Sequence, residues 1–228
     1  MKRLHRLLYG LIVALLPSMT SCGILDIDFD AETNLVESIT FQYDTVYVME
    51  NDTFFLAPYF YPDTVVSKNV TWVAEDDSIV RCIGSDTIVA AGVGTTHVIV
   101  STVANGKSDT CQVNVMPRWE LDPHQYPYEM VVYANISYEG KTIPANMKVG
   151  AFCNDEFRGV AVPMNVDRSL YRFRISGLFR GDAESYQEEI SILAYDGRTL
   201  QLYKPSLTFL FDGESHGLPS SPIEIKIK

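Results

Sequence analysis

The side chains best suited to catalysis or metal binding are four histidines and four cysteines, and they are scattered along the chain. No two histidines share an HExxH or similar spacing, and no two cysteines have the CxxC spacing of a zinc ribbon or thioredoxin-type site. A phosphate-binding loop and a GxGxxG motif are also absent. The sequence therefore predicts no catalytic residue, no metal ligand and no cofactor, and we expect a protein that is not an enzyme. A hydrolase is the weakest alternative, because no catalytic motif supports it. It stays open, because sequence spacing alone cannot reveal a Ser-His-Asp set.

Cys22 ends a segment that has the features of an export signal. Three basic residues precede the apolar run 7–16, which is shorter than the roughly twenty residues that a membrane-spanning helix needs. Small residues then lead to the cysteine, an order that resembles a bacterial lipoprotein signal. That resemblance implies cleavage after residue 21 and acylation of Cys22, so the membrane would be a partner through the lipid. The alternative is an ordinary secretory signal of which Cys22 is an incidental part.

Residues 22–33 are acidic and read as a tether between the lipid and the first domain. Acidic residues directly after a lipidated cysteine resemble surface-export signals of gut Gram-negative anaerobes, although a plain charged linker explains them equally well. We expect a cell-envelope location, as an outer-membrane lipoprotein exposed at the surface.

Composition and charge argue against several classes of protein. The chain of 228 residues is 46% hydrophobic, which is enough to form a core and argues against disorder. It has 18 basic and 29 acidic residues, a formal net charge of −11, so binding of nucleic acid through a basic groove is not expected. Asp76 and Asp77, and the aspartates of the tether, could bind calcium, but they lack the DxDxDG loop of a dedicated site and read better as a solvated turn and linker.

Both halves of the chain alternate apolar and polar residues in short runs separated by turn residues, which predicts an all-β protein with two tandem β-sandwiches. Residues 34–116 form the first predicted sandwich, with strands at 36–41, 45–49, 53–60, 69–73, 79–83, 87–91, 97–103 and 110–115. Pro117 marks the boundary, because proline cannot continue a strand ladder. Residues 117–228 form the second, with strands at 128–138, 148–153, 158–163, 171–176, 189–195, 200–203 and 223–228.

The first half also resembles a known family. The residues Ile39, Leu56, Pro62, Val70-Thr71-Trp72, Asp77-Ser78-Ile79, Gly94-Thr95 and Cys111 to Val115 are similar in order to the bacterial Ig-like domain group 2. The resemblance implies an immunoglobulin-like fold, a structural or adhesive module, and no catalytic residues. It also implies that Trp72 fills the space between the sheets and that Gly94 forms a tight turn before the next strand.

The second half resembles an uncharacterised β module that follows Ig-like domains in some bacterial surface proteins. The matching residues are Tyr128-x-Met130, Val149 to Phe152, Arg158 to Ala161, and Tyr195-Asp196. This resemblance implies no known activity. Gly159 predicts a bulge or a close backbone approach, and Arg158 is expected to pair with Asp155 or Glu156 at a surface turn, or alternatively to bind a ligand carboxylate.

Two of the remaining cysteines are placed for a disulfide. Cys82 and Cys111 fall at inward positions on predicted strands of opposite sheets, in a protein expected outside the cytoplasm, where disulfides persist. We expect a Cys82–Cys111 bond, the alternative being two buried thiols that act as small hydrophobic residues. Cys153 lies in an apolar strand and is expected to be inert.

Aromatic and hydroxyl residues supply the remaining candidate sites. Most aromatic residues fall at inward positions, but Tyr59, Tyr61, Tyr126 and Tyr128 are candidates for ligand contact, because exposed rings stack on sugar faces. Four Asp-Ser/Thr-aliphatic triplets resemble the O-glycosylation sequon of gut Gram-negative anaerobes, although turns before strands also favour this pattern; the modified residues would be Thr45, Thr64, Ser78 and Thr87.

These observations predict a non-enzymatic cell-surface lipoprotein that acts in adhesion or as an interaction scaffold. Its partner would be an extracellular protein or a glycan that the sequence does not identify. The alternative function is that of a glycan-binding accessory lipoprotein.

Overall fold

The computed structural model describes residues 35–84, 87–178 and 187–228, and residues 35–228 cluster as one compact unit. The expected signal, the expected lipidation site at Cys22 and the expected tether lie outside the described residues. Strands dominate the described chain, and its one short helical segment is η1 (Pro123–Gln125). No helix within these residues has the length and apolar character to span a membrane.

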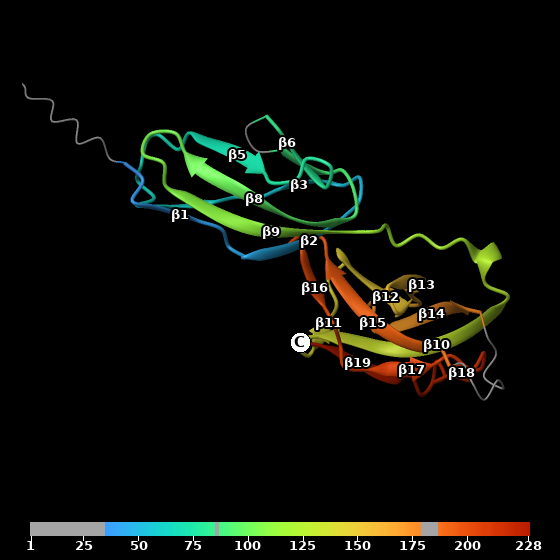
Figure 1. Ribbon diagram of the computed structural model, residues 1–228. Coiled ribbons are helices and arrows are strands. Elements are labelled where there is room, and N and C mark those ends of the chain that lie inside the picture. The colour runs from blue at the N-terminus through green and yellow to red at the C-terminus, as the bar shows by residue number, and fades with distance from the viewer. Residues whose placement is uncertain (1–34, 85–86, 179–186) are drawn as a thin grey trace, which may run out of the picture. The chain divides into compact units, whose positions relative to one another are not determined.

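The first nine strands build an immunoglobulin-like sandwich (Figure 1). One sheet has four strands in the order β2-β9-β8-β5, the facing sheet has three in the order β3-β7-β6, and β1 pairs with β4 separately. β2 runs parallel to β9, whereas the other pairs are antiparallel. The strand bounds are β1 Ser38–Thr40, β2 Thr45–Met49, β3 Thr53–Phe55, β4 Tyr59–Tyr61, β5 Val70–Ala74, β6 Val80–Ile83, β7 Thr87–Ala90, β8 Gly94–Thr102 and β9 Ser108–Met116.

The core of this sandwich explains its alternating sequence. Inward residues of β2, β3, β7, β8 and β9 form one buried cluster, and Trp72 packs against both this cluster and a smaller one around Val36 and Ile39. Because the first cluster contains residues of both sheets, Trp72 packs between them, as expected. Its ring also lies 5.8 Å from that of Phe41. Gly94 begins β8 with a positive φ of 151°, and a Cβ there would lie 2.8 Å from the side chain of Ile79.

The segment 53–60, expected as one strand, is two. β3 ends at Phe55 and pairs with β7, whereas β4 begins at Tyr59 and pairs with β1. Pro58 lies between them, and proline cannot donate the backbone hydrogen bond that a continuous ladder would need. The break moves the second part of the segment to a different strand partner.

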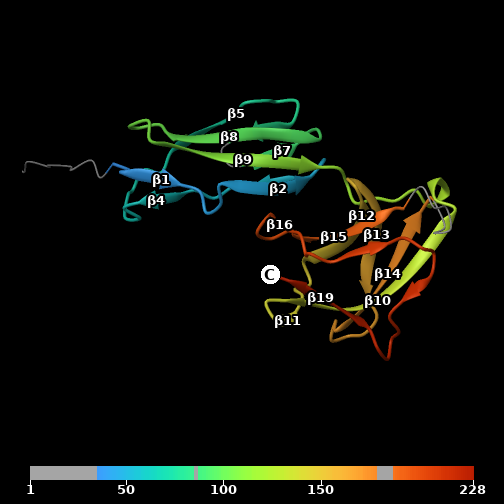
Figure 2. The ribbon, with the colours of Figure 1, turned by 60° about the horizontal axis from the view of Figure 1, so that its bottom comes forward.

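The second sandwich contains β10 to β19 (Figures 1 and 2). Its main strand order is β11-β10-β14-β13-β12-β15-β16; β17 also pairs with β15, and β18 and β19 run parallel to β10. The bounds are β10 Tyr128–Tyr138, β11 Lys141–Thr142, β12 Met147–Cys153, β13 Glu156–Pro163, β14 Leu170–Gly177, β15 Glu189–Asp196, β16 Gln201–Tyr203, β17 Thr208–Leu210, β18 Ser215–His216 and β19 Ile223–Ile227.

β13 joins the two layers of this sandwich. Its first part pairs with β12 and its last part, from Ala161, pairs with β14. The register shifts between Ala151 and Phe152, and a Cβ on Gly159 would collide with the carbonyl oxygen of Arg174. The close backbone approach expected at Gly159 is therefore confirmed, and glycine is required there by space.

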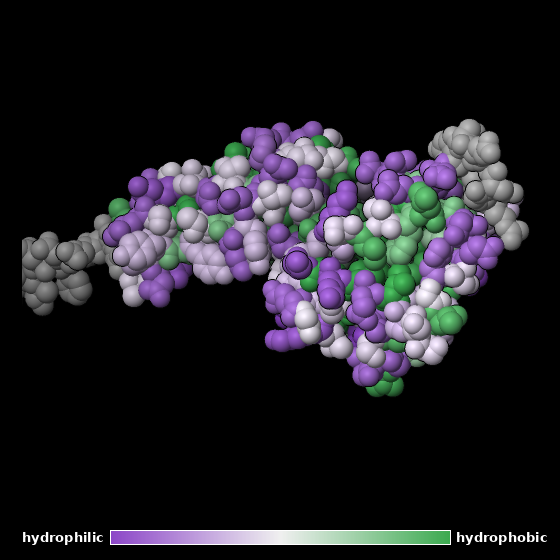
Figure 3. All heavy atoms as spheres, turned by 90° about the horizontal axis from the view of Figure 1, so that it is seen from below, coloured by the Kyte–Doolittle hydropathy of each residue, from purple (hydrophilic) through white to green (hydrophobic). Residues whose placement is uncertain are grey.

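Both layers contribute to one core, which includes Met130, Tyr171, Phe173 and Ile192. β17, β18 and β19 lie on the lower side in Figure 1. The view from that side in Figure 3 shows hydrophobic atoms gathered on the second sandwich and bordered by hydrophilic ones. This side of the sandwich is therefore not uniformly polar.

Candidate binding surfaces

Three aromatic side chains on neighbouring segments of the first sandwich are exposed. Phe55 at the end of β3 is 64% exposed, and Tyr59 and Tyr61 on β4 are 58% and 63% exposed. Single exposed apolar residues are ordinary on protein surfaces, whereas exposed apolar residues that gather in a patch often mark interaction sites. We call these three residues the aromatic surface.

Strand alternation positions this surface. Tyr59 and Tyr61 are two residues apart on β4 and so point to the same side, whereas Phe60 points inward and packs against the core cluster that contains Val36. The ammonium of Lys68 lies 5.6 Å from the centre of the Phe60 ring. The same pairing with β1 that buries Phe60 therefore exposes its two neighbours.

A cavity of about 320 Å³ adjoins the aromatic surface and is lined in part by Phe55, Tyr59, Tyr43 and Gln42. The Gln42 amide donates to the Tyr43 hydroxyl at 3.1 Å, and the Tyr59 hydroxyl donates to the Gln42 Oε1 at 3.3 Å. Aromatic rings with a polar tip and an adjacent amide can make both apolar and hydrogen-bonding contacts with a partner.

Tyr126 and Tyr128 lie elsewhere, on the second sandwich. Tyr128 begins β10 and is 40% exposed. Tyr126 is half-buried, with its ring centre 4.4 Å from the guanidinium carbon of Arg158. The pKa of the Tyr126 phenol is raised, because the effect of burial is larger than the opposite effect of the nearby Arg158. The four predicted contact tyrosines therefore do not form one site, and Tyr126 has a partner within the protein.

Arg158 is not at a surface turn as expected. Its side chain is 3% exposed, and Nη2 forms ion pairs with Glu188 Oε1 at 2.8 Å and Glu156 Oε2 at 3.0 Å. The pairing with Glu156 is confirmed, but the second and buried partner comes from a distant segment that sequence spacing could not identify. Because these carboxylates already neutralise the guanidinium, it does not serve as a ligand-carboxylate site.

A second cavity, of about 750 Å³, lies beside Trp119, Tyr126 and Phe157. Polar side chains on its wall include Asn114, Glu120, Gln125 and Asp155. This combination of rings, carboxylates and amides is the ordinary chemistry of a small-molecule or sugar site.

The aromatic neighbours of Trp119 fix its position. The Trp119 ring stacks on Phe157 with an interplanar angle of 19° and meets the edges of Phe152 and Tyr195. A Cβ on Gly150 would lie 3.0 Å from the Trp119 ring, so glycine leaves the room that the indole occupies. The sequence analysis assigned no role to Trp119. Its position at the predicted boundary, directly after Pro117 and Arg118, was the one feature that could have drawn attention to it.

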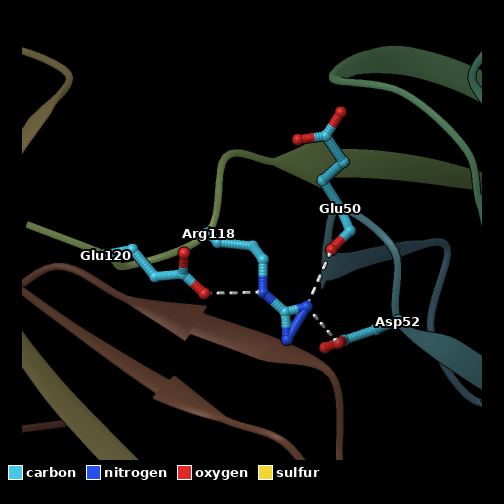
Figure 4. Close-up of polar contacts among 4 residues, drawn as sticks. All are labelled: Glu50, Asp52, Arg118 and Glu120. Carbon is cyan, nitrogen blue, oxygen red and sulfur yellow. Dashed lines mark hydrogen bonds and ion pairs between the residues drawn. The ribbon is translucent and has the colours of Figure 1, made fainter.

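Arg118 ties the segment after Pro117 to the turn between β2 and β3 (Figure 4). Its Nη1 donates to the Glu50 carbonyl at 3.3 Å and to Asp52 Oδ1 at 3.4 Å, and its Nε donates to Glu120 Oε1 at 3.1 Å. The Arg118 side chain is 43% exposed, so these pairs are positioning contacts of modest strength.

The expected Cys82–Cys111 disulfide is not formed in the structure, where both residues and Cys153 are free thiols. Cys82 and Cys111 do lie on facing sheets and pack against the same core, as expected. The Cys111 thiol instead contacts the Tyr43 carbonyl oxygen, with the sulfur 3.4 Å away. Burial raises the pKa of Cys111 to about 12, which disfavours the thiolate that disulfide formation requires.

The four candidate glycosylation residues differ in accessibility. Thr64 and Ser78 are exposed, whereas Thr45 on β2 and Thr87 on β7 are half-buried. The Ser78 hydroxyl donates to Asp76 Oδ1 at 2.6 Å in a local turn. Thr64 and Ser78 are therefore the two positions where an added sugar meets the least steric resistance.

One motif escaped the sequence analysis. Gly213 to Gly217 matches the letters GxSxG, and Asp212 lies 3.0 Å from His216 Nε2. A nucleophile elbow needs a strand-to-helix turn, but Ser215 and His216 are consecutive residues of β18 and so point to opposite faces. This geometry keeps the serine hydroxyl away from the imidazole.

Within the described residues, no group of three or more His, Cys, Asp and Glu side chains could hold a metal ion.

Comparison with known proteins names no family: no family profile and no curated protein matches the chain. Among solved structures it is similar to domains 4–9 of the surface layer protein SbsC, at 13% identity and a TM-score of 0.30, over 81% of this chain and 32% of that one. It is also similar to the extracellular cadherin domains 1–4 of protocadherin gamma B7, at 12% identity and a TM-score of 0.28, over 76% and 49% of the two chains. The chain thus spans about a third and about half of these two structures, and likenesses this distant carry no functional argument.

Proposed function

We propose that this chain is a non-enzymatic cell-surface lipoprotein that acts in adhesion or as an interaction scaffold. The observation that carries the proposal is the aromatic surface, whose residues Phe55, Tyr59 and Tyr61 are each more than half exposed to solvent. Aromatic residues are enriched in protein interfaces, where a few large rings supply most of the binding free energy.

The chemistry of the described residues supports a binding role over a catalytic one. Two of the buried charged residues of the second sandwich, Arg158 and Glu188, neutralise each other. The GxSxG segment lacks the geometry that would bring Ser215 to His216. The cell-surface location rests on the expected lipid at Cys22, and metabolic labelling with palmitate, compared with the Cys22→Ser variant, tests it.

An array of purified matrix proteins and glycans, probed with the full chain in detergent, tests the binding role. We expect at least one ligand whose signal is lost in the triple variant Phe55→Thr/Tyr59→Thr/Tyr61→Thr. Threonine keeps a β-branched residue on the strands. The matched control replaces the exposed residues Val66, Val73 and Val103 with threonine and should keep the signal. Equal loss in both variants, or a full array without any signal, would count against the proposal.

The second candidate function is glycan binding by an accessory lipoprotein. The cavity beside Trp119 favours it, because both aromatic rings and hydrogen-bonding side chains line it. Asp155→Ala, which removes an exposed cavity carboxylate, should then weaken a glycan signal that the aromatic-surface variant leaves intact.

Glycosylation is a further proposal that concerns the exposed positions. If the sequon resemblance holds, intact-mass measurement of protein from its native host should show added sugar that is reduced by Thr64→Ala and Ser78→Ala. A bare polypeptide with lipid would refute it.

A further inference from the structure

We propose that a lysine-lined cleft of the second sandwich binds an acidic sugar, one that carries carboxylate or sulfate groups. The cleft has a volume of about 500 Å³ and is separate from the aromatic surface and from the cavity beside Trp119. Its charged residues are Lys204, Lys226, Lys228 and Glu224. The inference therefore does not depend on the function proposed above.

The cleft lies where the two layers of the second sandwich present separate strands. β19 belongs to the layer of β10, and β16 belongs to the layer of β15. Lys226 lies between the buried Ile225 and Ile227 on β19, so its ammonium group points to the outer side. Lys228 follows β19 directly and is also exposed. Lys204 follows β16 directly and reaches the same cleft from the other layer.

This concentration of positive charge is unusual for the chain. Three of its eight lysines line one cleft, although the formal net charge is −11. All three are exposed, and none of the ion pairs between described side chains uses their ammonium groups. Their positive field is thus available to an anion and opposes the field of the whole protein.

The carboxylate of Glu224 has a hydrogen-bond partner outside the cleft. Glu224 Oε1 accepts a hydrogen bond from the Asn135 side chain on β10 at 3.0 Å. Glu224 and Asn135 are paired residues in the ladder between β19 and β10, so this contact is built into the strand register. Glu224 is the one acidic side chain that lines the cleft, so the side chains of the cleft together carry a net positive charge.

The uncharged wall favours a sugar over a bare anion. Tyr203, Pro205 and Leu207 line the cleft beside the lysines. The Tyr203 hydroxyl is 3.1 Å from the Tyr138 hydroxyl, and the two rings meet edge to face, which fixes the Tyr203 ring. A sugar ring can pack its apolar face on such a wall while its acidic groups meet the lysines.

Titration calorimetry with the full chain in detergent tests this inference. The probes are oligogalacturonate, a sulfated dextran oligosaccharide, neutral dextran of similar length and poly-glutamate of similar charge. We expect binding of at least one acidic oligosaccharide that weakens as salt is added, because salt screens exposed charges. Neutral dextran should not bind, and poly-glutamate should bind at least tenfold more weakly.

Two triple variants with equal net charge identify the site. Lys204→Gln/Lys226→Gln/Lys228→Gln should weaken binding at least tenfold, whereas Lys68→Gln/Lys107→Gln/Lys148→Gln should change it less than twofold. All six lysines are exposed, and thermal unfolding checks that both variants fold. Equal weakening in both variants would overturn the inference, as would equal affinity for poly-glutamate or no binding of either acidic oligosaccharide.

Discussion

The guanidinium of Arg158 and the carboxylate of Glu188 form a buried ion pair, with Nη2 2.8 Å from Oε1 and both side chains at most 3% exposed. Glu188 Oε2 also accepts the backbone N–H of Leu178 at 2.8 Å, which links the end of β14 to the start of β15. The Tyr126 ring covers the guanidinium. One buried charge pair therefore fixes three segments of the second sandwich.

Loss of one member of this pair should be costly. We expect Arg158→Met and Glu188→Gln each to lower the free energy of unfolding by about 3–5 kcal/mol, because each leaves a buried group without its partner. The double variant should lose less than the sum of the two single losses. Urea denaturation measures these values. Arg174→Met, which removes an exposed pair with Glu129, is the control and should cost under about 1 kcal/mol.

Gly150→Ala tests the position of Trp119. The added methyl would lie 2.9 Å from the Phe152 ring and 3.0 Å from the Trp119 ring. We expect destabilisation by about 1–3 kcal/mol from overcrowding. A red shift of indole emission, measured in a Trp72→Phe background, should accompany it. Gly140→Ala adds a methyl in open space, so it should leave the emission unchanged, although alanine is strained at the positive φ of 75° that Gly140 has.

Asp212 should make stability depend on acid. Burial opposes its ionisation, but the backbone N–H of Glu214 and the His216 side chain outweigh this and hold the pKa of Asp212 below its ordinary 3.8. A carboxyl with a lowered folded-state pKa stabilises the fold above its ordinary pKa, and this contribution is lost as pH falls through the folded-state value. The loss in Asp212→Asn at neutral pH should be under about 1 kcal/mol, since the group is 40% exposed. Urea titrations should show it vanish in strong acid; a difference that grows on acidification would contradict this account.

The thiols offer a test of the free-cysteine arrangement. Alkylation of the denatured protein without reductant should label Cys82, Cys111 and Cys153. In the folded protein at mildly alkaline pH, Cys111 should react more slowly than Cys82, because Cys111 is fully buried and its pKa is about 12. Peptide mapping by mass spectrometry measures both. If Cys82 and Cys111 were labelled only after reduction, the free-thiol arrangement would be contradicted and the disulfide predicted from the sequence would be supported.

Local patterns predicted the strands well where one face of a strand is buried. The run 128–138 was predicted with the bounds that β10 has, because its alternation continues without interruption. The prediction of a single strand over 53–60 was wrong. Aromatic residues typical of strands lie on both sides of Pro58, so the sequence did not indicate that the strand partner changes there. The short strands β11, β17 and β18 were missed, since two or three residues are too few to show a period.

The candidate sites depended on long-range contacts that the sequence does not display. Exposure of Tyr59 and Tyr61 followed from alternation around the inward Phe60 and could be anticipated. The pairing of Arg158 with Glu188 could not, because they are on segments that only the folded sandwich brings together. The same is true of Lys204 and Lys226, which share a cleft but belong to different layers.

Photocrosslinking at the aromatic surface tests the central claim most directly. Benzoylphenylalanine replaces Tyr61 in one protein and Val73, another exposed residue of the first sandwich, in a second. Each is irradiated with the ligand found on the array. The proposed function predicts a covalent adduct from position 61 and none from position 73. Adducts from position 73 alone, or equal adducts from both, would contradict the role given to Phe55, Tyr59 and Tyr61.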